Sequence, residues 1–448
     1  MTDTGNPLKK WALYVYLGAN VPEAPVREAA VESLLQMATV GSSGQVAVAA
    51  QLHLPGKWAH RYVMPERPPG SSPATLAPVE TFPNVNSADP WTLVQFFQWA
   101  ADKCPAEKTM LVVWGHGYGL DDYVPHGAKP HPETQILTKS PANEPFLEKA
   151  QSAFPKQNLQ ASTAPGASAP SSPVVQLTAI FDNQHQEVSP NWQIAGAARI
   201  CSHILSSTPN RELAIFAFDA CNMGMAEVWC EFYDSARVGI ATEAQEPYAS
   251  FPYDRFLARL HLQPGADSNQ VAQMMVDAYV ESYAYEKDTY VTLSSCDLTQ
   301  TGSLEESVKP LATALTRAAK DKAARATIFE ARNDCPIFDQ DGFIDLGRFC
   351  EILATTLPSK DVKDACQKVH TALNSFVSYA RYSPLDPTRR VSQTTGLAVW
   401  FPPWLQNPSV EILEKKESVA YLSHGYPQTK FALGTGWDTF LKSMASAT

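Results

Sequence analysis

An acid and a thiol stand two residues apart at the point where an apolar segment ends. Asp219 and Cys221 follow the unbroken apolar run 213–218, and a glycine and a helical pattern come next. A run bounded in this way predicts a strand that is buried on both faces of a parallel sheet. Residues two apart in an extended chain point to the same side, and a helix N-terminus behind a cysteine favours its thiolate. The segment therefore offers a candidate nucleophile beside a candidate specificity acid.

A histidine that could serve this thiol follows a second apolar run. His116 stands between Gly115 and Gly117, directly after residues 110–114. Glycines allow the backbone to approach a neighbour closely, and the carboxyl ends of parallel strands share the edge of the sheet where ligands bind. A lone cysteine is most often a packing residue, and a lone histidine is most often satisfied by a carbonyl group. Two neighbouring strands that deliver both side chains to one edge would instead favour catalysis.

The surrounding segments alternate between strand and helix patterns, which predicts right-handed crossovers and a largely parallel sheet. Ser87–Asp89 and Ser189–Asn191 offer N-terminal caps for two of the helices, and residues 242–253 are expected to form a loop at the active-site edge. We expect strands at 10–17, 45–52, 58–63, 110–114, 213–218, 237–241, 290–295 and 397–401, and helices at 22–38, 90–101, 191–205, 223–233, 256–260, 269–285 and 304–320.

An insert interrupts this alternation between the histidine and the cysteine strands. Residues 121–175 are rich in Pro, Ala, Ser and Thr, and their only basic residues are lysines 129, 139, 149 and 156. A segment of this length without a secondary-structure pattern is either a functional loop or a disordered spacer.

Length, charge and cysteine content narrow the classes of protein to which the chain could belong. The 448 residues suffice for one large α/β domain with an appended unit, or for two domains. A net charge of −11 argues against nucleic acid or an anionic membrane as the main partner. The eight cysteines lack metal-site spacing, so we expect reduced thiols. The start of the chain has no signal-peptide pattern and no apolar run approaches 18 residues, so we expect a cytoplasmic protein.

The two motifs resemble those of a known family. Trp114–Gly117 and Asp219–Gly224 are similar to the His and Cys motifs of the clostripain-like cysteine peptidases, and residues 11–17, 242–243, 252–253, 396–402 and 435–437 extend the likeness over nearly the whole chain. The resemblance implies a caspase-like α/β fold, a three-layer sandwich with a mostly parallel central sheet, and a mainly helical C-terminal unit. We expect a peptidase domain at 8–300, with 121–175 as a flexible processing loop, and a helical domain at 301–448.

The resemblance also implies the roles of individual residues. Cys221 would be the nucleophile and His116 its acid–base partner, with no third acid required, and the backbone N–H groups of Gly117 and Cys221 would form the oxyanion hole. Asp219 would line the primary pocket and pair with a substrate Arg or Lys, with Arg preferred because a carboxylate binds guanidinium bidentately. Glu243 is a second candidate for that pocket. Asp219 could also cap the following helix.

Activation is a further implication of the resemblance. Caspase-like peptidases are commonly made as zymogens and cut between the His and Cys strands, by themselves or by an activating protease. Lys149 and Lys156 are the expected cleavage sites, because Lys129 precedes a proline. The relatives are often exported, and some need calcium; apart from calcium by resemblance, we expect no cofactor and no metal. Substrates would be proteins or peptides with Arg or Lys before the scissile bond, and a bacterial signalling or defence cascade is the expected setting.

Two departures from the family pattern and two alternatives stay open. Asn222 stands where the family has an apolar residue, and residues 249–252 lack its Gly-Trp pair, which leaves the cleavage preference open. One alternative is a catalytically inactive caspase-like scaffold for regulated protein binding. The other is a metal-dependent hydrolase that uses the loop from His116 to His131, including Asp121, Asp122 and His126.

Overall fold

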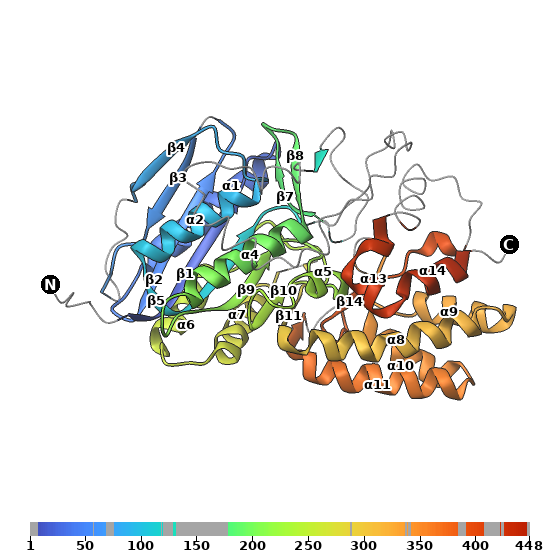
Figure 1. Ribbon diagram of the computed structural model, residues 1–448. Helices are drawn as coiled ribbons and strands as arrows, with labels where there is room; N and C mark the ends of the chain where they lie inside the picture. Colours follow the sequence, from blue (N-terminus) through green and yellow to red (C-terminus); the bar gives the residue numbers. More distant parts are fainter. Residues whose placement is uncertain are drawn as a thin grey trace.

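A computed structural model of the protein describes residues 8–56, 58–68, 76–117, 119, 129–130, 178–286, 289–336, 338, 342–383, 391–406, 422 and 425–445. Its centre is a nine-stranded sheet in the order β13-β11-β10-β9-β5-β1-β2-β3-β4 (Figure 1). The five strands from β10 to β2 run parallel, and antiparallel strands extend the sheet at both edges. The strands are β1 Lys9–Gly18, β2 Val46–His53, β3 Trp58–Val63, β4 Glu80–Pro83, β5 Ala106–Trp114, β9 Glu212–Asp219, β10 Val238–Ala241, β11 Thr292–Asp297 and β13 Val377–Tyr382.

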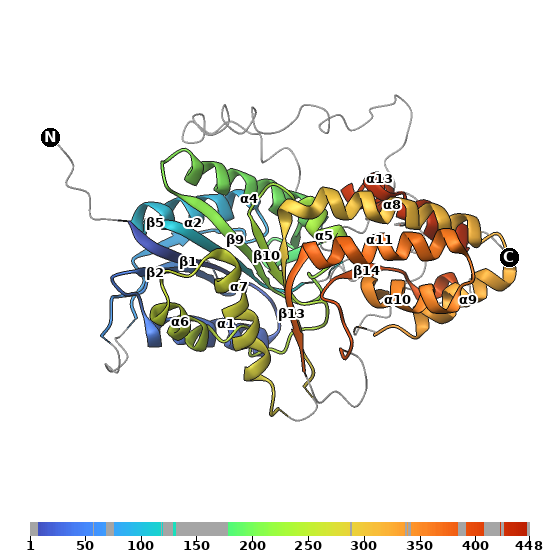
Figure 2. The same cartoon turned by 90° about the horizontal axis from the view of Figure 1, so that it is seen from below.

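Helices cover both faces of this sheet and make three layers (Figure 2). One face carries α1 Ala24–Val40, α6 Tyr253–Leu262 and α7 Ser268–Ser282, and the other carries α2 Pro90–Lys103 and α4 Asn191–Ser206. Strand β1 explains why: Tyr14 and Tyr16 pack into one core, while Leu13 and Val15 pack into the other. Burial of both faces is what an unbroken apolar strand requires, so the expected α/β sandwich is confirmed.

The strands that deliver the two candidate catalytic residues are direct neighbours. Strand β5 pairs with β9 in parallel, and Trp114 at the end of β5 lies opposite Asp219 at the end of β9. His116 and Cys221 each follow two residues later, so both emerge at the same edge of the sheet. The expected adjacency is confirmed.

A small sheet beside the insert was not predicted. It has the order β6-β8-β7, with β6 Lys129–Pro130, β7 Thr178–Asp182 and β8 Glu187–Pro190.

One of the two predicted helix caps is wrong. Pro190 is the N-cap of α4 and no side chain caps this helix, so Ser189 is not a cap, whereas Asp89 caps α2 as expected. Ser189 instead lies in β8, where it pairs with β7 in the antiparallel sheet. Apart from residues 129–130, the predicted processing loop, including Lys149 and Lys156, lies outside the described residues.

The C-terminal part is mainly helical and gathers beyond the β11–β13 edge of the sheet (Figure 1). A two-stranded sheet joins β12 Phe343–Asp345 to β14 Ala398–Trp400, so the strand expected at 397–401 is confirmed. The same region also supplies β13 to the central sheet, and the proposed division at residue 300 stays a prediction. The helices are α8 Thr301–Ala318, α9 Lys322–Asn333, α10 Leu346–Thr356, α11 Lys360–Phe376, α13 Lys430–Thr435 and α14 Trp437–Ala445. Among the helices described, none combines the length and the apolar character that crossing a bilayer needs.

Candidate active site

The loop after β5 packs directly against the turn that carries the cysteine. A Cβ atom added at Gly117 would lie 2.0 Å from the carbonyl oxygen of Cys221 and 2.7 Å from its nitrogen. Only glycine fits such a contact. The side chain of His116 is 23% exposed and Cys221 is partly exposed, so solvent reaches both groups at this edge. The backbone of the histidine loop and that of the cysteine turn therefore touch, and the thiol is accessible.

A backbone donor reaches the sulfur of Cys221. The N–H of Glu246 donates to Sγ over 3.1 Å from the loop that follows β10. The predicted helix at 223–233 begins later, since α5 covers only Ala226–Glu231. The chain between Cys221 and α5 instead runs along the end of β10, where Asn222 N donates to Ala244 O and Gly224 N donates to Thr242 O. The expected support of the thiolate by a helix end is therefore wrong at this spacing, and the N–H of Glu246 supplies it.

The turn conformation accounts for the unusual residue after the cysteine. Asn222 has a φ of 57°, in the left-handed region. Asparagine tolerates this conformation better than other residues with a side chain, whereas a β-branched residue is strained there. Asn222 is thus suited to the sharp turn that exposes Cys221.

Asp219 is buried beneath the cysteine and held by three donors. Its side chain accepts from Ser250 Oγ at 2.6 Å, from Phe251 N at 3.2 Å and from Tyr253 Oη at 2.6 Å. All three donors belong to or adjoin the predicted loop at 242–253, and no N–H of α5 is among them. Burial raises the pKa of Asp219 to about 6, against the opposing effect of the hydrogen bonds from Ser250 and Tyr253.

A second buried carboxyl, which the sequence reasoning missed, adjoins Asp219. Burial raises the pKa of Glu246 well above its usual range, and the neighbouring Asp219 raises it further. Two carboxyls that share a buried site cannot both ionise easily without a cation. Among the residues that the structure describes, neither carboxyl forms an ion pair with a lysine or an arginine, and Glu246 Oε1 is buried without a hydrogen bond. Glu246 lies in an aperiodic loop, so its place among the acids of that loop was its only signal in the sequence.

The structure does not bring Glu243 into this group. Its carboxyl accepts from Thr292 Oγ1 at 3.2 Å and adjoins Asp345, and burial raises its pKa well above the usual range, as Asp345 also does. The turn after β10 explains the difference, because Ala244 N donates to Thr242 Oγ1 and Glu243 is directed toward β11. Glu246, rather than Glu243, is the glutamate that adjoins Asp219.

A carboxylate also approaches the candidate acid–base residue. Glu23 Oε2 lies 3.4 Å from His116 Nε2, although the resemblance implied no third acid. Burial lowers the pKa of His116, and Glu23 raises it in opposition.

The C-terminal part supports the turn that carries the cysteine. Ala398 N on β14 donates to Gly224 O over 2.9 Å. Glu227 on α5 is fully buried, and its Oε1 accepts from Trp400 N at 3.0 Å and from Tyr426 Oη at 2.7 Å. Burial raises the pKa of Glu227 to about 7, against the hydrogen bonds from Tyr426 and Trp400.

The alternative metal site stays a prediction, because four of its residues lie outside the described part of the chain: Asp121, Asp122, His126 and His131. Within the described part of the chain, no three His, Cys, Asp or Glu side chains form a group that could hold a metal ion.

Comparisons with known proteins agree with this arrangement. The model of the clostripain family, peptidase family C11, matches residues 201–443, which is more than half of the chain and includes Cys221. A secreted C11 cysteine protease from Bacteroides thetaiotaomicron, solved in complex with an irreversible peptide inhibitor, shares the fold at a TM-score of 0.59 and 12% identity, over 96% of this chain and 99% of that one. An inactive zymogen C11 protease from Parabacteroides distasonis gives a TM-score of 0.58 at 14% identity, over the same shares of 96% and 99%. No curated protein matches the chain in sequence.

Proposed function

Because this chain belongs to the clostripain family of cysteine proteases, we propose that it is an endopeptidase that cleaves after arginine and lysine through a Cys221–His116 dyad. The contact between Gly117 and the Cys221 turn supports the dyad, since it joins the two strand ends over one small region of the sheet edge. The solved structures that resemble this chain add only that it shares its fold with proteases of this family.

The reaction follows from the chemistry of these groups. The thiolate of Cys221 attacks the scissile carbonyl and forms a thioacyl-enzyme, while His116 protonates the leaving amine and then activates the hydrolytic water. The backbone N–H groups of Gly117 and Cys221 stabilise the oxyanion, each by roughly 3 kcal/mol.

The preference for a basic residue rests on one observation: Asp219 and Glu246 form a buried pair of carboxyls next to the nucleophile. Without a cation beside it the pair retains a proton, because two buried carboxyls do not both ionise easily. A substrate guanidinium replaces this proton and accepts both charges, and its planar donors fit a carboxylate better than an ammonium does. Glu246 also links recognition to chemistry, because its backbone N–H donates to Cys221 Sγ while its side chain adjoins Asp219.

Digestion of a peptide library tests this specificity. The variants are Asp219→Asn and Glu246→Gln, with Glu243→Gln as a matched change of a buried glutamate in the same loop. Removing one partner of a desolvated charge pair costs about 2–5 kcal/mol, so Asp219→Asn should lower kcat/KM for arginyl substrates by roughly 30-fold or more. Glu243→Gln should keep the wild-type preference. Undiminished arginine preference in Asp219→Asn rejects the pocket, and cleavage only after non-basic residues rejects the specificity as a whole.

We propose in addition that the enzyme is a zymogen that is cut at Lys149 or Lys156, by itself or by an activating protease. The support is the position of the insert between β5 and β9 and the family, in which the Parabacteroides structure is of an inactive zymogen. Mass spectrometry of the fully active enzyme tests this, because a single intact chain would refute it. A cytoplasmic location, a cascade role and a calcium requirement stay predictions.

A further inference from the structure

Glu23 directs its carboxylate to the candidate acid–base residue. It stands at the N-cap position of α1, but glutamate is not among the short polar residues that usually cap a helix, and no side chain caps α1. The Glu23 side chain, 49% exposed, extends to His116 Nε2 over 3.4 Å. This contact is the observation that links Glu23 to the acid–base residue.

Hydrogen bonds hold the backbone before and after Glu23, in the loop between β1 and α1. Asn20, three residues before it, accepts from Asn183 N at 2.7 Å and donates from Nδ2 to Asp182 Oδ1 at 2.8 Å. Arg27 Nη1 donates to the carbonyl of Val21 at 3.0 Å. The backbone between β1 and α1 is therefore held by buried contacts up to the residue that points at His116.

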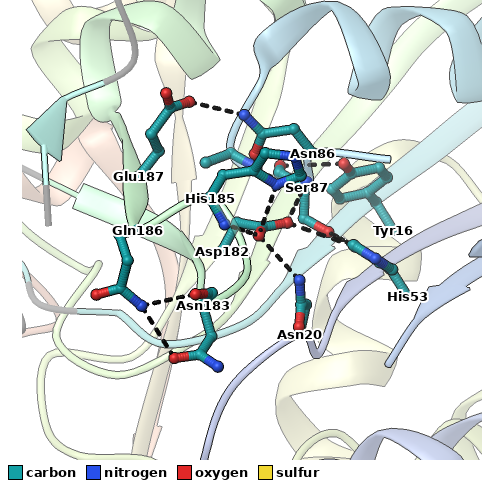
Figure 3. Close-up of polar contacts among 11 residues, drawn as sticks. Tyr16, Asn20, His53, Asn86, Ser87, Asp182, Asn183, His185, Gln186 and Glu187 are labelled. Carbon is teal, nitrogen blue, oxygen red and sulfur yellow. Dashed lines mark hydrogen bonds and ion pairs between the residues drawn. The ribbon is translucent and has the colours of Figure 1, made fainter. Parts of the chain in front are cut away.

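Asp182 is the centre of these contacts (Figure 3). The fully buried carboxylate also accepts from Ser87 N at 2.8 Å and from His185 Nδ1 at 2.9 Å, and it lies 3.5 Å from His53 Nδ1. Asp182 ends β7, the first strand after the insert. We call Asp182 with these partners the Asp182 hub; it ties the chain that leaves the insert to the loop that carries Glu23.

We propose that Glu23 is a positioning residue for His116, held in place by the Asp182 hub. The carboxylate binds Nε2 and orients the ring that serves the leaving group and the hydrolytic water. The proposal rests on the proposed function in that His116 is the acid–base residue.

The contact with Glu23 changes the pKa of His116 in a definite direction. Glu23 faces His116 from the loop before α1, Cys221 faces it from the neighbouring turn, and Asp219 and Glu246 lie on the Cys221 side. The Glu23 carboxylate raises the pKa of His116 against the effect of burial. Its removal lowers that pKa, so the imidazolium that must protonate the leaving amine is lost at a lower pH.

The test compares Glu23→Gln with Glu28→Gln, which makes the same change at an exposed position of the same helix. The substrate is whichever peptide the wild type cleaves best. We expect Glu23→Gln to lower kcat roughly tenfold with KM within about twofold, and to shift the upper limb of the kcat–pH profile to lower pH. Glu28→Gln should match the wild type, and melting temperatures should agree. A profile for Glu23→Gln that superimposes on the wild type, or a change in KM alone, overturns the proposal.

A second measurement needs no substrate and so separates this proposal from the proposed specificity. Iodoacetamide alkylates Cys221 as the thiolate, which a well-placed imidazolium stabilises below neutral pH. Glu23→Gln should slow alkylation several-fold at pH 6 and Glu28→Gln should not; equal rates overturn the proposal. Asn20→Ala, which loosens the loop, should act in the same direction. If that variant does not fold, Glu23→Gln decides the question alone.

Discussion

Replacement of Gly117 by alanine should separate catalysis from folding. The added methyl group would lie 2.0 Å from Cys221 O and 2.7 Å from Cys221 N, where ordinary van der Waals contacts are 3.4–4 Å. The histidine loop must therefore move away from the cysteine turn by roughly 1 Å, because the opposing atoms are backbone rather than a flexible side chain. A displacement of this size at reacting groups costs on the order of 100-fold in rate, and overpacking costs about 1–3 kcal/mol in the free energy of unfolding.

Steady-state kinetics, alkylation of Cys221 and thermal unfolding measure these effects together. The matched control is Gly302→Ala on α8, where an added Cβ meets nothing within 4 Å. We expect kcat/KM to fall about 100-fold in Gly117→Ala while cooperative unfolding persists, and Gly302→Ala to resemble the wild type. Activity of Gly117→Ala within about twofold of the wild type would refute the close approach of the two strand ends.

Three further results follow from the turn and from the buried acids. Asn222→Val, at a φ of 57°, should cost about 1–2 kcal/mol in the free energy of unfolding, measured by urea denaturation, whereas Asn222→Gly should stay near the wild type. The pKa of Glu227 is raised to about 7, so the wild type should lose up to roughly 3 kcal/mol of stability as pH rises from 4.5 through 7. Glu227→Gln should lack this slope in melting curves recorded at pH 5 and pH 8, and an equal slope would contradict the burial. The pKa of Asp219 is raised to about 6, so KM for an arginyl peptide should rise as pH falls through 6 in the wild type, while Asp219→Asn should show a flat profile.

The sequence was sufficient to place the proposed nucleophile and its proposed partner at one edge of the sheet. Residues 110–114 and 213–218 are apolar throughout, and such runs have few stable positions other than the centre of a parallel sheet. Because the two strands are neighbours, the residues that follow them share an edge, and His116 and Cys221 could be predicted without any knowledge of side-chain positions.

The residues that surround the dyad could not be predicted in this way. Glu246 and Glu23 lie in loops, where no periodicity indicates the direction of a side chain, and only the folded backbone shows which acid faces the thiol or the imidazole. Glu243 and Glu246 lie in the same loop, yet a turn after β10 directs Glu243 to Thr292. Strand β13 was missed because it follows α11 without a break and is only partly buried, which gives it no clear alternation.

The central claim is that Cys221, assisted by His116, performs the cleavage. Peptide-bond hydrolysis by the wild type, Cys221→Ala and His116→Ala, combined with mass-spectrometric mapping of a thiol-directed peptide inhibitor, tests it most directly. We expect one adduct, on Cys221, with hydrolysis abolished in Cys221→Ala and strongly reduced in His116→Ala. Hydrolysis that persists in Cys221→Ala, or labelling of Cys221 no faster than that of the buried cysteines, would contradict it and favour the metal-dependent hydrolase or the inactive scaffold.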